Sequence, residues 1–475
     1  MKSEISRQEI LNGPIIKTMM KLGWPVMAGT VLQTTYQLAD TFWLGNLSGD
    51  ESGTAVASLQ TSFPLIWFFV AFIVGFAVSG TALVSQYSGA DNRDSANFAA
   101  SQVFSFNITL GVVGAIAGFF LMPLILPLIT KEADIVSAST KYLRLFVLGL
   151  PFMFTTGIFR ILFAASGNTK TPMYVAIFTN ILNIVIDPFF IKGIGPLPAM
   201  GIEGAALATI ISQFAGASAA VYIMFFKSHK LSLSFSSLIP SWKWFLRIFK
   251  IGFPAAIGHS LESMGFVILT GIIGRLPDPR TALGAYGVAN RIIHLVFIAV
   301  TGLAQGLTTM VGQSLGYGDK KRATTVAFQG IGFLVIILIV QAAVLVLLRY
   351  ELLSFFVPGE EDIIREGSYV FLYFVPLGVP LFGFIRGVSA VFNAAGKNIP
   401  VMIISMFRLW VFRLPIVIIF STIATSPSKG IWIGMGLSNL LTGILALFFF
   451  MKGGWKKGEI HTEKQHTEPD VVTAR

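Results

Sequence analysis

The chain has 475 residues, of which 54% are hydrophobic and only 12% charged, and this excludes an ordinary soluble enzyme or binding domain, in which about a quarter of the residues are charged. Its formal net charge of +11 does not indicate a nucleic-acid partner, because the Lys and Arg residues are spread over short connections instead of one basic surface. The absence of Cys excludes disulfides, thiolate nucleophiles and Cys-bound metals.

Apolar segments recur from one end of the chain to the other, and only short polar stretches separate them. With about 20 apolar residues per membrane span, each half of the chain contains six predicted helices. The pattern predicts an all-α polytopic membrane protein with 12 transmembrane helices in the lipid bilayer of the cell membrane. The predicted spans are 15–44, 54–83, 96–128, 137–165, 170–192, 203–227, 246–274, 282–314, 322–350, 364–395, 399–424 and 429–452.

Lys and Arg gather in alternate connections, and this asymmetry predicts the orientation of the chain. The basic connections should be cytoplasmic, so both termini are expected inside; the opposite connections, around Asp50 and Glu360, are richer in acid. The first residues lack the pattern of a cleaved signal peptide, so we expect the first helix to target the chain. The basic residues and ranges behind this prediction are Lys2, Arg7, Lys17, Lys21, Arg93, Lys170, 227–250, Lys320, Lys321, Arg322, Lys397, Lys456 and Lys457.

The two halves of the sequence repeat each other at an offset of about 227 to 229 residues. LGWPVMAGTVLQ, from Leu22, resembles IGFPAAIGHSLE, from Ile251, and VSQYSGADNRDSA, from Val84, resembles VGQSLGYGDKKRA, from Val311. Because each half has an even number of spans, the two halves share one orientation and predict two pseudo-symmetric six-helix lobes around a cleft. The predicted segments are an N-terminal tail at 1–14, an N-lobe at 15–228, a cytoplasmic linker at 229–245, a C-lobe at 246–452 and a C-terminal tail at 453–475.

The first predicted helix carries a polar face. Gln33, Tyr36 and Asp40 follow one another at i, i+3 and i+7, which places them on one side of a helix. An ionised carboxylate at mid-bilayer costs roughly 2.5 to 3.5 kcal/mol, so Asp40 is expected either to function or to bond to a neighbouring helix. We expect Gln33, Tyr36 and Gln37 to line a substrate cavity.

The fifth predicted helix repeats this spacing with Asn180, Asn183 and Asp187. Asp40 and Asp187 each lie within about five residues of the predicted outer end of their helix, so both reach a similar depth and can share one cavity. Two carboxylates in one low-dielectric site repel each other and are readily protonated. The predicted role of Asp40, Asp187, Asn183 and Asn180 is therefore ion coupling, with H⁺ or Na⁺ as the ion and no other cofactor.

The second half has a different set of polar residues. The positions equivalent to the two aspartates are Leu269 and Leu414, so ion coupling is predicted for the N-lobe alone. Glu262 lies near mid-depth in the seventh helix, one turn after His259. It either binds an ion or substrate, or forms a structural salt bridge with a cation such as Arg291, and the sequence leaves both readings open.

Two arginines, Arg160 and Arg386, occupy equivalent places in the repeats, near the predicted cytoplasmic ends of their helices. A long side chain at such a place reaches the membrane surface. A scaffold role is therefore predicted for both, in preference to substrate contact.

Four segments, ILNGPIIKTMMKLGWPVM, LADTFWLG, ASGNTKTP and NIVIDPFF, together resemble the multidrug and toxic compound extrusion (MATE) transporters over nearly the whole chain. The resemblance implies twelve helices in two lobes, alternating access, and efflux of varied, often cationic compounds against entering H⁺ or Na⁺. It also places the chain near the prokaryotic, DinF-like branch, because Asp40, Asp187 and Asn183 match its N-lobe acidic site. Tyr142 and Thr209 are weaker matches to cavity residues.

The chain departs from the sodium-coupled branch of that family. The branch pairs a helix-seven glutamate with a helix-ten aspartate, but the tenth helix here reads FIRGVSAVF. A complete C-lobe sodium site is therefore not expected, whereas Na⁺ at Asp40, Asn183 and Asp187 stays open.

The expected function is secondary active efflux of small organic molecules by a protein acting as a monomer. We expect protonation of Asp40 and Asp187 to bend the first helix near Pro25 or Gly45 and to expel substrate. The alternative is a flippase for a lipid-linked oligosaccharide or lipid, although such cavities are strongly cationic and we find few Arg or Lys within the predicted spans. No extramembrane loop or catalytic motif indicates an enzyme.

Overall fold

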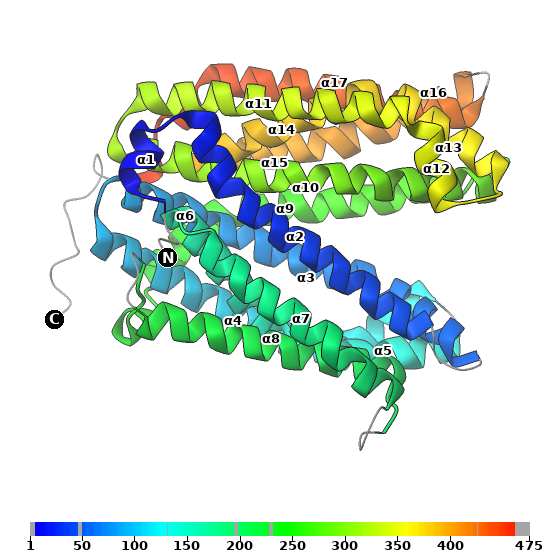
Figure 1. The fold of residues 1–475 in the computed structure, drawn as a ribbon, viewed down its shortest axis with the longest axis horizontal. Helices are drawn as coiled ribbons and strands as arrows, with labels where there is room; N and C mark the ends of the chain where they lie inside the picture. The colour runs from blue at the N-terminus through cyan, green and yellow to red at the C-terminus, as the bar shows by residue number, and fades with distance from the viewer. Residues whose placement is uncertain are drawn as a thin grey trace. The chain divides into compact units, whose positions relative to one another are not determined.

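The secondary structure is helical, and the computed structural model contains no strand in the residues that it describes, which are 5–45, 50–130, 132–193, 198–227, 231–424 and 426–460 (Figure 1). Predictions for Lys2, for the side chain of Asp50 and for the tail beyond Ile460 fall outside these residues or their described side chains. The helices are α1 (Arg7–Asn12), α2 (Ile15–Gly45), α3 (Asp50–Gly89), α4 (Arg93–Ile129), α5 (Ala133–Leu148), α6 (Leu150–Ser166), α7 (Lys170–Lys192), α8 (Gly201–Phe226), η1 (Phe235–Leu238), α9 (Trp242–Ile273), α10 (Pro279–Tyr317), α11 (Lys320–Leu347), α12 (Arg349–Phe356), α13 (Glu361–Tyr373), α14 (Val375–Ala395), α15 (Ile399–Met406), η2 (Phe407–Arg413), α16 (Leu414–Ile423), α17 (Pro427–Lys452) and η3 (Gly454–Lys456).

Each predicted span corresponds to one helix or to consecutive helices. Within the described residues, ten helices are long and apolar enough to cross a membrane, and eleven if α5 and α6, bent by 51°, form one span. α2 has 31 residues but is less apolar, because it carries Gln33, Gln37 and Asp40. The all-α, multi-pass membrane fold is confirmed.

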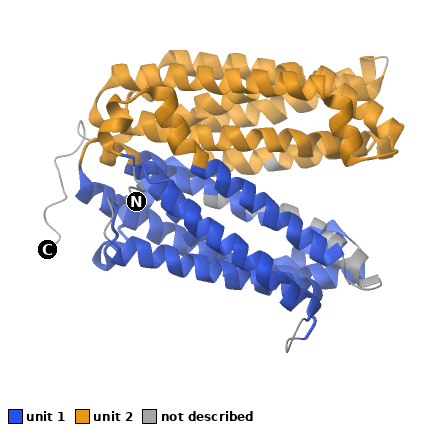
Figure 2. Cartoon of the chain, viewed as in Figure 1, with its two compact units in different colours: residues 1–5, 25–84, 92–252 blue, residues 6–24, 85–91, 253–475 orange. Residues whose placement is uncertain are grey.

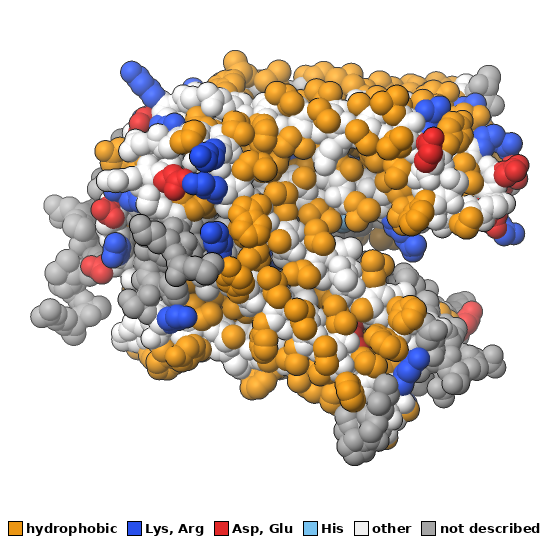
Figure 3. Space-filling view, in the orientation of Figure 1, with side chains coloured by type: hydrophobic (Ala, Val, Ile, Leu, Met, Phe, Trp, Pro, Cys, Tyr) orange, Lys and Arg blue, Asp and Glu red, His pale blue; other side chains and the backbone are white. Residues whose placement is uncertain are grey.

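The outer surface fits a lipid environment. On the face drawn in Figure 3, hydrophobic side chains cover the sides of the helices, and charged side chains lie mainly toward the helix ends. α11 is an example, because Ile336, Ile339, Val340 and Leu347 are all more than half exposed. An apolar surface of this extent is expected only where lipid covers it.

The chain divides into two compact units that do not follow the order of the sequence (Figure 2). Unit 1 contains residues 1–5, 25–84 and 92–252, and unit 2 contains 6–24, 85–91 and 253–475. α2 therefore begins in unit 2 and enters unit 1 at Pro25, whereas α9 begins in unit 1 and enters unit 2 at Phe253. The predicted lobe boundaries, drawn along the sequence, stay predictions.

Glycines allow the initial turns of α2 and α9 to pack closely. A Cβ at Gly23 of α2 would lie 3.0 Å from the backbone of Gly302 in α10, inside unit 2. A Cβ at Gly252 of α9 would lie 2.9 Å from the Cα of Phe76 in α3, inside unit 1. The first helix of each repeat thus has a glycine that allows close contact with the backbone of a neighbouring helix.

The pair α7 and α8 holds one side of the predicted ion site, and its packing depends on Gly204. α7 and α8 pack along each other in unit 1. A Cβ at Gly204 would lie 2.3 Å from the backbone oxygen of Phe190. Since a backbone atom cannot rotate away, only glycine fits here without moving the helix.

We expect Gly204→Ala to lower the free energy of unfolding by about 1 to 3 kcal/mol, because the added methyl forces α7 and α8 apart. Thermal unfolding of the purified protein in detergent measures this. The control is Gly271→Ala in α9, where an added Cβ meets nothing within 4 Å; it should be neutral or stabilising. A Gly204→Ala protein that melts at the wild-type temperature would contradict the packing argument.

The span 399–424 contains a π-helix, η2, between α15 and α16. π-Helical turns are rare and often lie at functional sites. Both arginines of η2 are buried: Arg408 is 3% exposed and Arg413 is 2% exposed. The π-helix thus places two guanidinium groups inside unit 2.

Candidate functional site

The site in unit 1 is built from α2 and α7, with α5 beside them. Asp187 of α7 is fully buried, and Asn183, one turn earlier, is 3% exposed. Asn183 Nδ2 donates a hydrogen bond of 3.1 Å to Asp187 Oδ1, which fixes this carboxylate against its own helix. Asp40 of α2 is half-buried.

The structure brings Asp40 and Asp187 together. Their side chains are close enough for a hydrogen bond between the two carboxyl groups and for repulsion when both are ionised. A carboxyl–carboxyl hydrogen bond requires one proton, because an ionised carboxylate only accepts. The pair can therefore hold a proton.

Three oxygens at this site have no hydrogen-bond partner among the described residues. They are Asp40 Oδ1, Asp187 Oδ2 and Asn183 Oδ1, and all three are buried. Buried polar atoms are nearly always satisfied, so a cluster of unsatisfied acceptors is unusual. Each of these oxygens could accept a hydrogen bond or contact a small hard cation.

Two tyrosines lie around the carboxylates. Tyr36 of α2 and Tyr142 of α5 are both close enough to interact electrostatically with Asp40 and Asp187. Gln37 hydrogen-bonds to Tyr36. These polar groups are the ones that the sequence predicts beside the aspartates.

The wall behind the tyrosines is apolar. Tyr142 belongs to a buried hydrophobic cluster with Leu44, Phe146 and Ile191, and its ring stacks on Phe146 with centroids 5.9 Å apart. Water-poor surroundings strengthen electrostatic interactions between neighbouring groups. A change in the charge of the aspartate pair therefore has a strong electrostatic effect on the residues around it.

Three other predicted residues have no recorded bond to the pair. Asn180 and Thr209 are buried, at 7% and 8% exposure. Gln33 is exposed on α2. The structure records no hydrogen bond from any of the three to Asp40 or Asp187 within the described chain. Their roles stay predictions.

Glu262 in α9 forms an ion pair with Arg408 of the π-helix, in unit 2. Arg291, the cation considered from the sequence, is exposed on α10 and is not its partner. Sequence reasoning missed Arg408 and Arg413, although FRLWVFR places two arginines in an apolar predicted span. The expectation of few intramembrane arginines was therefore wrong.

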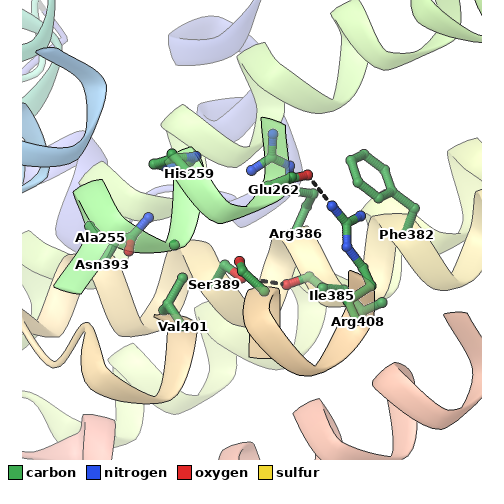
Figure 4. A pocket seen from close by; sticks show the side chains of 12 residues that line it. Ala255, His259, Glu262, Phe382, Ile385, Arg386, Ser389, Asn393, Val401 and Arg408 are labelled. Atoms are coloured by element: carbon green, nitrogen blue, oxygen red, sulfur yellow. Dashed lines mark hydrogen bonds and ion pairs between the residues drawn. The ribbon is translucent and has the colours of Figure 1, made fainter. Parts of the chain in front are cut away.

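A pocket lies beside this ion pair (Figure 4). His259, Glu262, Arg386 and Arg408 line it. Arg386 lies near the middle of the span Val375–Ala395, so its predicted place at a helix end was wrong. The physical reason is that α14 continues for nine residues after Arg386, about 13 Å, too far for its side chain to reach the end.

Arg160, which the sequence comparison of the repeats pairs with Arg386, also lines a pocket. This smaller space in unit 1 is bounded mainly by apolar residues, among them Pro25, Gly29 and Pro172. Its polar lining comes from Arg160 and Thr169. The scaffold role predicted for Arg160 stays a prediction.

Groups of three or more His, Cys, Asp or Glu that could hold a metal ion are absent from the described residues. The aspartate pair with Asn183 has oxygens suited to a transported cation, but it does not form a closed metal site.

Comparison with known proteins identifies what the chain is similar to. The family model described as MatE matches residues 25–189 and 254–419, and the model described as lipid II flippase MurJ matches residues 132–253. "Probable multidrug resistance protein NorM" of Thermotoga maritima is 28% identical over 98% of both chains. "Probable multidrug resistance protein YpnP" of Bacillus subtilis is 27% identical over 96% of this chain and 99% of its own.

A solved structure has the same fold. The structure described as MATE in complex with MaL6 superimposes with a TM-score of 0.87 at 22% sequence identity, covering 95% of this chain and 100% of its own. The two regions matched by the MatE model each contain one of the internal repeats. The whole architecture is therefore found in known proteins.

Proposed function

Because the chain belongs to the MatE family of membrane transporters, we propose that it exports small organic molecules in exchange for an entering cation, with Asp40 and Asp187 as the ion-coupling residues. The cation is H⁺ in this proposal, and Na⁺ is the alternative that the experiment separates. The expected substrates are amphipathic compounds.

The cluster of unsatisfied oxygens carries this proposal. Asp40 Oδ1, Asp187 Oδ2 and Asn183 Oδ1 come from two helices and are all acceptors. In an ion-coupled transporter, the oxygens of such a site bind the ion in one conformation and release it in another. A structural hydrogen-bond network would instead be complete without an ion.

The number of available oxygens favours H⁺ over Na⁺. A proton needs only one carboxylate oxygen and can be shared between Asp40 and Asp187. Hard metal cations are usually surrounded by about six oxygens, and the described residues supply three unsatisfied ones here. The hydroxyls of Tyr36 and Tyr142, which interact electrostatically with both aspartates, are additional oxygens at this site.

α2 offers a way to transmit the change in charge. Its residues before Pro25 belong to unit 2, and its residues after Pro25, including Asp40, belong to unit 1. Proline removes one helical hydrogen bond and allows a bend. We propose that protonation of the aspartate pair changes the bend of α2 at Pro25 and that deprotonation toward the cytoplasm restores it.

The available energy is sufficient for useful export. One proton that moves inward across 100 mV releases roughly 2.3 kcal/mol. Fully coupled to one uncharged substrate molecule, this supports about fifty-fold accumulation. For a monovalent cationic substrate the exchange moves no net charge, and the pH gradient alone drives it, with about tenfold accumulation per pH unit. One titrating pair is therefore enough.

Dye uptake into inverted membrane vesicles tests the proposal. We expect rhodamine 123, a cationic xanthene dye, to accumulate when the vesicle interior is acidic, because the exit of protons drives its entry. A sodium gradient alone should give no accumulation. Uptake driven by sodium would replace H⁺ with Na⁺, and uptake that responds to neither gradient would remove the exchange mechanism.

The flippase alternative has less support. The lipid II flippase model covers only residues 132–253, whereas the MatE model covers both repeats. The proposal therefore remains a small-molecule exporter.

A further inference from the structure

The pocket beside Glu262 in unit 2 lies outside the proposed ion site. Its lining comes from α9, α14, α15 and the π-helix. Figure 4 shows the ion pair between Glu262 and Arg408 at one end, with His259, Ser389 and Asn393 further along.

The charges around this pocket do not balance. Arg408 is paired with Glu262. Arg386, which also lines the pocket, forms no ion pair with a carboxylate among the described residues. Behind the pocket, Arg413 donates to neutral partners, Ser438 Oγ at 3.0 Å and Asn439 Oδ1 at 2.6 Å.

This part of unit 2 therefore holds more positive than negative charge. Three guanidinium groups lie near one another, and Glu262 is the carboxylate that interacts with them in the described residues. An uncompensated charge inside a membrane span is expensive and is by default connected to function. A ligand with an anionic group would compensate it.

The two guanidinium groups next to the pocket are held in place. Arg386 and Arg408 each lie over the ring of Phe382, at 5.3 Å from its centroid. Because Arg408 is also bound to Glu262, its position is fixed twice. The N–H groups of Arg386 remain available for a further partner. A guanidinium group can donate two parallel hydrogen bonds to the oxygens of one carboxylate or phosphate.

The remaining lining is suited to an amphipathic ligand. Asn393 Oδ1 is buried and has no hydrogen-bond partner among the described residues, so this amide has unused polar capacity at the pocket. Ala255, Ile385 and Val401 supply apolar surface. The pocket thus combines a cationic end with apolar walls.

We propose that this pocket binds the anionic group, a carboxylate or phosphate, of an amphipathic organic substrate, with Arg386 as its main partner. This inference rests on the proposed function, and it adds that the substrates include organic anions. The anion belongs to a solute and not to a lipid headgroup.

Two dyes with the same xanthene scaffold test the inference, fluorescein as the anion and rhodamine 123 as the cation. Binding is measured by fluorescence anisotropy on the purified protein in nanodiscs of phosphatidylcholine, which has no net charge. In Arg386→Gln, we expect the Kd of fluorescein to rise at least about tenfold, because a charge-assisted pair of hydrogen bonds is lost. The Kd of rhodamine 123 should stay within about twofold of the wild-type value, which also shows that the variant is folded.

Two further variants separate position from charge. Arg386→Lys keeps the charge but loses the paired donors, so it should weaken fluorescein binding less than Arg386→Gln does. Arg291→Gln removes the same charge from an exposed position on α10 and should bind fluorescein as the wild type does. Equal weakening in Arg291→Gln and Arg386→Gln would overturn the site.

Other outcomes would also overturn the inference. These are unchanged fluorescein binding in Arg386→Gln, loss of both dyes together, or displacement of fluorescein by added phosphatidylglycerol, which would assign the site to a lipid headgroup. The vesicle assay distinguishes this result from the proposed function. Fluorescein binding that depends on Arg386, without ion-driven uptake of either dye, would retain the pocket and reject the exporter; ion-driven uptake of rhodamine 123 with unchanged fluorescein binding would do the reverse.

Discussion

Asp40→Asn and Asp187→Asn should each reduce ion-driven accumulation of rhodamine 123 from about tenfold, for a gradient of one pH unit, to no accumulation. Asparagine has nearly the same shape as aspartate, but its amide cannot bind and release a proton near neutral pH. In Asp187→Asn, the side-chain oxygen can still accept the hydrogen bond from Asn183 Nδ2. The variants should therefore be present in the membrane in normal amounts and still bind dye, while losing the exchange.

The measurement is dye uptake into inverted vesicles with an acidic interior, corrected for the amount of transporter. Asp278→Asn is the matched control, because Asp278 is a carboxylate at the start of α10 that accepts a hydrogen bond from the backbone of Thr281. Asparagine caps a helix as well as aspartate does, so uptake should be unchanged. Normal accumulation in both aspartate variants of the ion site would exclude Asp40 and Asp187 from coupling.

Glu262→Gln should lower the free energy of unfolding by about 3 to 5 kcal/mol, because it leaves the guanidinium of Arg408 buried without its partner. The side chain of Arg408 is only 4% exposed, and that of Glu262 is 15% exposed. Replacement of both residues, Glu262→Gln with Arg408→Gln, should recover much of this loss, since no unpaired charge then remains. Thermal unfolding of the purified proteins in detergent measures the three variants.

An exposed ion pair provides the comparison for Glu262→Gln. Glu360 lies 3.7 Å from Arg280, and both side chains are more than half exposed. Glu360→Gln should therefore leave the melting temperature almost unchanged. Transport adds a second check: per folded molecule, Glu262→Gln should retain more ion-driven uptake than Asp40→Asn. Wild-type stability in Glu262→Gln, or a double variant less stable than the single one, would show that the ion pair does not hold α9 to the π-helix.

The pairing of Asp40 with Asp187 could be anticipated because it depends on local quantities. The spacing i, i+3, i+7 determines which residues share a helix face, and the distance from the helix end determines depth. Both quantities can be counted along the chain. The contact between these two residues of α2 and α7 agrees with that counting.

The partner of Glu262 could not be anticipated in this way. Arg408 and Arg413 are five residues apart, which on an α-helix separates them by about 140° around the axis. In η2 the hydrogen bonds connect residues five apart, so both arginines come close to one face. Nothing in the apolar run around FRLWVFR indicates that change of helix type.

By itself, the sequence determined the membrane location, the helical faces and the internal repeat, because composition, periodicity and duplication are properties of neighbouring residues or of the chain as a whole. Only the tertiary structure decided which cation meets Glu262, that Arg386 lines a pocket, and that α2 and α9 each begin in one unit and continue in the other. Such choices depend on side chains that pack together from positions more than a hundred residues apart, and packing selects among several partners that the sequence leaves equally available.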